Sequence, residues 1–92
     1  MAVSARDTIR RGDVLWRASL NGVLIRVPGA HEVVKLAGTG AAVWAELDAP
    51  ITFGSLCDAL AESHDASADR IAVDLAPVIA DLAEKRVVVV DG

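Results

Sequence analysis

The residues that could do chemistry in this 92-residue sequence are few, and the strongest pair is Cys57 with His64. Both fall on roughly one face of a predicted helix, but seven residues separate them by ~10.5 Å along its axis. A nucleophile needs its base close by, and zinc ligands must converge within ~2.3 Å of one ion. We therefore interpret Cys57 as a core thiol and His64 as a surface residue at a helix end.

The remaining candidates are weaker. His31 lies in a predicted turn with no evident orienting partner, and Asp74 and Asp81 lie two turns apart on a helix, where carboxylates usually only solvate the surface. The segment 38–40, Gly-Thr-Gly, is too short for a phosphate-binding loop and lacks its lysine. The sequence thus predicts no catalytic residue, no cofactor and no metal site, and a small hydrolase that uses Cys57 and His64 remains an alternative to be tested.

Composition excludes other classes. The chain carries 9 basic and 13 acidic residues, a net charge of −4, which makes nucleic acid a poor ligand because phosphate binding depends on clustered Lys and Arg. A single cysteine cannot build a disulfide or a cysteine-held metal site within the chain. Apolar runs fall short of the ~18 residues of a membrane span, and no signal-peptide core follows the first residues. A cytoplasmic protein without membrane contact is expected.

The first half of the chain is typical of strands. Residues 14–19, 22–28 and 32–37 are rich in β-formers, and Asn21-Gly22 is a strong hairpin signal. They predict a three-stranded antiparallel meander with the second strand in the centre. Residues 1–12 are expected to form a flexible arm in front of one domain over 13–92.

The second half predicts three amphipathic helices, capped by Thr39, Thr52 and Ser67. Gly38 and Gly40 would let the backbone leave the third strand sharply. Pro77 removes an amide from the third helix, which should kink it or divide it into two. The fold class is therefore α+β and resembles a winged helix-turn-helix, with residues 87–91 as a short final strand.

The edge of the sheet is the best candidate binding site, because an extended peptide can pair with unpaired amides and carbonyls. Proline at position 34 should weaken such pairing. About half of the side chains are expected in the core, since alternation buries one face of a strand. The third strand contributes Val33, Val34, Lys35 and Leu36, and the third helix would form the opposite wall with Arg70, Ile71, Asp74 and Val78.

Residues 22–89 also resemble the PqqD-like family, whose members are called RiPP recognition elements and include leader-binding proteins of lasso-peptide pathways. Ala37, where many relatives have a polar residue, and Pro77 depart from the family pattern. The resemblance is carried by Leu36, Thr39-Gly40-Ala41, Trp44, Leu47-Asp48 with Pro50, the Leu56 to Leu60 segment, Asp74, Leu82 and the hydrophobic end.

This resemblance implies a peptide-binding module that is not an enzyme. Relatives hold the leader of a ribosomally made precursor peptide along the third strand and third helix and present it to a modifying enzyme, such as a radical S-adenosylmethionine enzyme, or to a leader peptidase. The alternative is a winged-helix DNA-binding transcriptional regulator. An acidic third helix, with Asp69, Asp74, Asp81 and Glu84, disfavours it. The free edge permits a monomer or a strand-paired homodimer.

Overall fold

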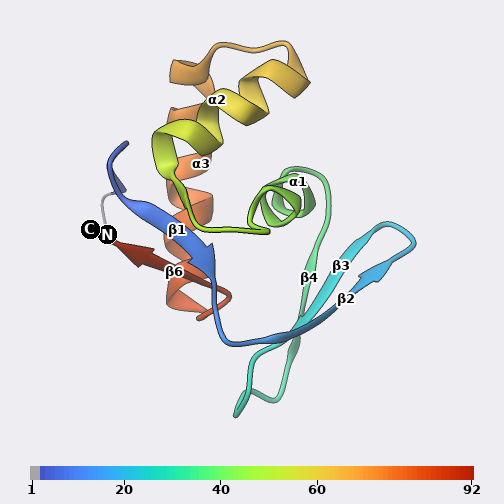
Figure 1. The fold of residues 1–92 in the computed structure, drawn as a ribbon. Coiled ribbons are helices and arrows are strands. Elements are labelled where there is room, and N and C mark those ends of the chain that lie inside the picture. Colours follow the sequence, from blue (N-terminus) through green and yellow to red (C-terminus); the bar gives the residue numbers. More distant parts are fainter. Residues whose placement is uncertain (1–2) are drawn as a thin grey trace.

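The computed structural model describes residues 3–92, in which three helices pack beside two three-stranded antiparallel sheets (Figure 1). The first sheet is the predicted meander, in the order β2-β3-β4 with β3 in the centre. Its register places Ser19 opposite Gly22 and Val23 opposite Leu36. The strands are β2 (Leu15–Ser19), β3 (Gly22–Arg26) and β4 (Val33–Leu36).

The second sheet was not predicted, and it joins the beginning of the chain to its end. Its order is β5-β1-β6, and Ile9 in the central strand is fully buried. Residues 8–11 therefore form a strand instead of part of a flexible arm, because Ile9 supplies a core side chain; residues 1–2 of that arm lie outside the described residues. The strands are β1 (Thr8–Arg11), β5 (Ile51–Thr52) and β6 (Val88–Asp91).

The three helices occur where the sequence places them, and two of the three predicted caps are confirmed. Thr52 accepts a hydrogen bond from the amide of Ser55, and Ser67 accepts one from the amide of Arg70. Thr39 is not a cap: it lies in the first turn, and Gly38 precedes it with a φ of 56°. The helices are α1 (Thr39–Glu46), α2 (Phe53–His64) and α3 (Ala68–Glu84).

Helix α3 continues through Pro77, so of the two expected outcomes, a kink or a division into two helices, the division is wrong. Pro77 is exposed, and it lies on the side of α3 away from the buried Leu75 and Ile79. A carbonyl that loses its helical amide partner on an exposed face can bind water instead, which lowers the cost of the proline. The apolar stripe keeps α3 in one piece.

The hairpin between β2 and β3 also differs in detail from its sequence signal. The turn residues are Leu20 and Asn21, and neither has a positive φ, so the turn is not the type that Asn-Gly favours. Gly22 begins β3, as predicted. A Cβ at Gly22 would lie 1.9 Å from the carbonyl oxygen of Leu36, so close strand approach requires glycine there.

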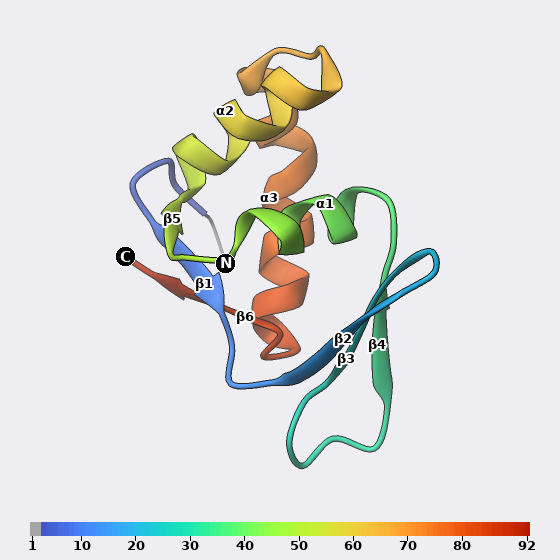
Figure 2. The same ribbon diagram turned by 45° about the vertical axis from the view of Figure 1, so that its right-hand side comes forward.

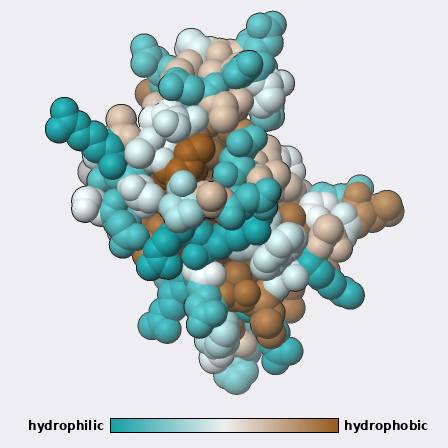
Figure 3. Space-filling view, in the orientation of Figure 1, coloured by the Kyte–Doolittle hydropathy of each residue, from teal (hydrophilic) through white to brown (hydrophobic). Residues whose placement is uncertain are grey.

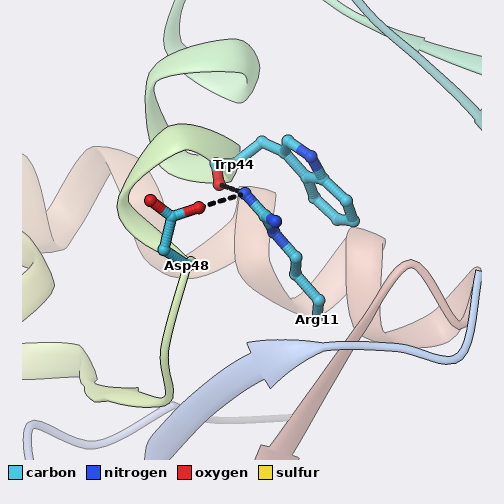
Figure 4. Close-up of polar contacts among 3 residues, drawn as sticks. All are labelled: Arg11, Trp44 and Asp48. Atoms are coloured by element: carbon cyan, nitrogen blue, oxygen red, sulfur yellow. Dashed lines mark hydrogen bonds and ion pairs between the residues drawn. The ribbon is translucent and has the colours of Figure 1, made fainter. Parts of the chain in front are cut away.

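A cluster around Arg11 connects β1, β2 and α1. The Arg11 guanidinium lies 4.7 Å from the ring centroid of Trp16 and 4.6 Å from that of Trp44. Its Nη2 donates to the Trp44 carbonyl at 2.7 Å and to an Asp48 carboxylate oxygen at 3.3 Å (Figure 4). Because Trp44 is buried at the centre of the core, this cluster holds the two sheets to the helical half.

The architecture is the predicted α+β class. The term winged helix-turn-helix describes it only loosely, because β1 and β6 build a second sheet that a simple meander followed by helices lacks. The predicted final strand is confirmed as β6.

Candidate functional site

Strand β4 is an edge strand: within residues 3–92 its only strand partner is β3. The direction of its backbone groups follows from Gly22, because the Leu36 carbonyl oxygen is the atom that a Cβ on Gly22 would strike. The Leu36 carbonyl thus points toward β3, and Val23 and Leu36 form a hydrogen-bonded pair.

Hydrogen-bonded and non-hydrogen-bonded pairs alternate along an antiparallel ladder. Val34, two residues before Leu36, therefore also directs its N–H and C=O toward β3. Lys35 and Val33 direct theirs away from the sheet. The free pairing groups of this edge belong to Val33 and Lys35, so proline at position 34 would remove a bond of the sheet itself, and position 35 is the informative one.

Side chains of the four predicted edge residues divide between the two faces of the sheet. Leu36 is buried in the core and Val34 is half-buried, on the same face as Ile25. Val33 is 59% exposed and Lys35 is exposed, both on the opposite face. Leu36 thus contributes to the core and not to a surface that a ligand could touch.

In Figure 2 the chain runs in opposite directions in α3 and β4. Two surface depressions lie near the ends of β4. At the start of β4, a depression of about 450 Å³ is lined by Val33, Val34, Lys35 and, across from them, Lys85. Just past the end of β4, a smaller one of about 90 Å³ has Thr39, Ile71 and Asp74 among its lining residues. Neither depression is lined by residues of both β4 and α3, so a continuous groove between strand and helix stays a prediction.

The predicted α3 residues lie on the helix surface as follows. Arg70 and Asp74 are exposed and form an ion pair with an Nε to Oδ2 distance of 3.6 Å, while Ile71 and Val78 are half-buried against the core. Ile71 and Asp74 line the smaller depression, and Val78 follows one turn later. Arg70 lines neither depression and can reach the groove only through its pairing with Asp74.

Eight residues that line the two depressions were not among the predicted binding residues: Val27, Ala30, Glu32, Thr39, Leu60, His64, Leu75 and Lys85. Thr39 was read as a cap, and Lys85 as a helix end. Lys85 lies seven residues after Val78, which is the spacing of one helix face, so extending the stripe by two turns would have found it. Its ammonium is 3.0 Å from the Asp81 carboxylate.

Cys57 and His64 do not form a reactive pair. Burial, with a smaller contribution from the Asp58 carboxylate, raises the pKa of the Cys57 thiol above its ordinary value of 9.0. The Nδ1 atom of His64 lies 2.9 Å from the Leu60 carbonyl and 3.1 Å from the Ser63 hydroxyl, both in its own helix. Across residues 3–92, no group of three or more His, Cys, Asp or Glu side chains could hold a metal ion.

The comparisons with known proteins agree with this geometry. Residues 22–88 match the family described as Coenzyme PQQ synthesis protein D (PqqD). The chain belongs to the PqqD family. This match covers β3 and β4 of the first sheet, β5, all three helices and the first residue of β6, but not β2.

A solved PqqD structure has the same fold. It is the solution NMR structure of the PqqD truncation of Methylobacterium extorquens PqqCD, described as a functional and stand-alone RiPP recognition element. The two chains are 28% identical with a TM-score of 0.77, and the alignment covers 95% of this chain and 94% of that one. No curated protein matches. No helix in the described part of the chain is long and apolar enough to cross a membrane.

Proposed function

We propose that this PqqD-family protein binds the leader segment of a ribosomally synthesised precursor peptide, by strand addition to β4 and contacts in the groove beside α3. The bound precursor is then presented to a modifying enzyme or a leader peptidase. The protein itself performs no chemistry in this proposal.

One observation carries the proposal: the backbone N–H and C=O groups of Val33 and Lys35 point away from the sheet, at an edge that no second strand covers within residues 3–92. An extended peptide can satisfy all of them at once. Family membership supports the same role, and the related M. extorquens domain is described as a RiPP recognition element.

Groove chemistry indicates the kind of leader that would fit. Val34 and Ile71 offer apolar surface in the two depressions, and Val78 is half-buried one turn beyond Asp74. Glu32, Lys35 and Lys85 line one depression, and Asp74 lines the other. An amphipathic leader with apolar side chains on alternate residues would fill such a groove. DNA is disfavoured because α3 exposes Asp69, Asp74, Asp81 and Glu84.

The decisive experiment is a matched pair of proline variants, Lys35→Pro and Ala18→Pro. Lys35→Pro removes an outward amide from β4 and leaves the ladder with β3 intact. Ala18→Pro removes an outward amide from β2, the opposite edge, because Ser19 faces Gly22 and the directions alternate. Each proline thus removes one outward-pointing backbone N–H, on β4 in one variant and on β2 in the other.

Binding would be measured by fluorescence anisotropy with labelled leader peptides from precursor genes that neighbour this chain's gene. We expect Lys35→Pro to weaken binding about tenfold or more. The loss of one hydrogen bond costs up to about 1.4 kcal/mol of binding free energy, which corresponds to a tenfold higher Kd. Ala18→Pro should bind as the parent does. Parental affinity of a folded Lys35→Pro protein would refute strand addition at β4.

A further inference from the structure

The face of the first sheet turned away from the helices combines exposed apolar and basic side chains. Leu15 is 69% exposed and Val33 59%, with the half-buried Leu24 between them on the middle strand. The register places these residues in adjacent rows of the same face. They help to line a shallow hollow of about 250 Å³. Hydrophobic surface over this sheet is visible in Figure 3.

Charge on this face is the reverse of that of the whole molecule. Arg17, Arg26 and Lys35 surround the apolar residues, and none of the three forms an ion pair with another described residue. The three strands contain no Asp or Glu, although the chain as a whole has a net charge of −4. Three unpaired basic side chains around an apolar patch are more than solubility requires in an acidic protein, and such a patch marks a binding surface.

We infer that this face, defined by Leu15, Arg17, Leu24, Arg26, Val33 and Lys35, docks the modifying enzyme through an apolar patch with an acidic rim. The inference rests on the proposed function for the identity of the partner. Charge complementarity selects an acidic partner surface, because opposite charges steer the encounter and fix its register. A second copy packed face to face would bring the Arg and Lys residues of the two protomers together, which is repulsive.

Size makes this docking weak without the leader. Strand spacing and rise give a face on the order of 15 by 15 Å, far below the ~800 Å² per partner of a stable interface. Val33 and Lys35 belong both to this face and to the pairing edge of β4, so a leader added there becomes a fourth strand of the same surface. The enzyme then contacts carrier and leader together, and each ligand tightens the binding of the other.

The test separates the face from the edge by mutating β2, which lies across the sheet from β4. The variant is Leu15→Ser with Arg17→Glu, and the control is Arg6→Glu, which makes the same charge change at an exposed, unpaired arginine outside the sheet. The probe is the purified modifying enzyme encoded beside this chain's gene. Its binding is measured by calorimetry at low and moderate salt, first without any peptide and then with saturating leader.

We expect the double variant to bind the enzyme at least tenfold more weakly and to keep its leader affinity within twofold. Arg6→Glu should change neither, and the parent's affinity should fall as salt rises. Parental enzyme binding by a folded double variant would overturn the inference. The inference would also be overturned if the double variant lost self-association in sedimentation, or lost binding to phosphatidylserine vesicles, while its enzyme binding stayed unchanged. Failure of leader binding alone would refute the proposed function and leave the peptide-free enzyme measurement as an independent result.

Discussion

Arg11 is partly exposed, and yet its replacement should destabilise the fold clearly. Its guanidinium lies between Trp16 and Trp44 and donates to the last turn of α1. Two cation–π contacts and a charged hydrogen bond together contribute about 2 kcal/mol or more at a partly desolvated site. Arg11→Gln should therefore lower the free energy of unfolding in urea by about that amount.

Its neighbour Arg10 is the matched control. Arg10 pairs with Asp91 at 3.1 Å, but both side chains are about half exposed, so the pair is screened. Arg10→Gln should cost less than about 1 kcal/mol. Equal losses for the two variants would show that the aromatic cluster adds nothing beyond a surface ion pair.

Cys57 gives a prediction for alkaline pH. Because burial raises the pKa of its thiol above 9.0, the unfolded chain releases this proton at lower pH than the folded chain does. The thiol's contribution to stability is complete below pH 9 and is lost as pH rises toward the folded pKa. Urea titrations from pH 8 to 10.5 should show a steeper decline for the parent than for Cys57→Ala.

The reactivity of the thiol checks the same point without a mutation. At pH 8, a disulfide reagent should modify Cys57 in native protein far more slowly than in urea, because only the exposed thiolate reacts. Rapid native modification would contradict the burial and would revive a reactive role for this residue.

At the scale of elements, Gly22 and Gly40 differ in whether the structure has room for a larger side chain. Gly22→Ala should destabilise the protein by about 1 to 3 kcal/mol, since its Cβ would collide with the Leu36 backbone. Gly40 lies inside α1, where an added Cβ meets the Leu36 side chain at an ordinary 3.4 Å. Gly40→Ala should therefore be neutral or stabilising by up to about 1 kcal/mol. Thermal denaturation of both variants measures the contrast.

The same two glycines show what local sequence can predict. Strands and helices were predictable where apolar residues recur over at least four or five positions, as in β3 and α3. Gly22 was predicted to begin a strand after an Asn-Gly turn, but its actual constraint is a carbonyl 14 residues away in β4. Pattern alone does not contain such a long-range contact, and for that reason it also left open which β4 amides face outward.

For the whole molecule, the largest omission was the second sheet. Strand β1 has only one buried apolar residue, Ile9, within four positions, so no alternation could distinguish it from an irregular arm. Its partner strand β6 was recognisable from its valines, but a pairing between the two ends leaves no local trace. The proposed binding residues lie on β4 and α3, two elements that the sequence predicted, and their role stays a prediction.

Ile9 allows a direct test of this sheet. Ile9→Ala should cost about 2 to 5 kcal/mol, as expected for a fully buried side chain, whereas Val90→Ala, its half-exposed register partner, should cost less. Chemical denaturation compares the two. A loss below about 1 kcal/mol at Ile9 would mean that residues 8–11 are an arm after all.

The pairing of β1 with β6 has a consequence for biosynthesis. Arg10 and Asp91 are 81 positions apart and yet lie in one sheet, so the central strand of that sheet must wait for almost the entire chain to leave the ribosome. The meander and helices depend on contacts closer in sequence and can assemble earlier. A nascent chain stalled before residue 88 would therefore contain all of β4 while its N-terminal strand still lacked its longest neighbour.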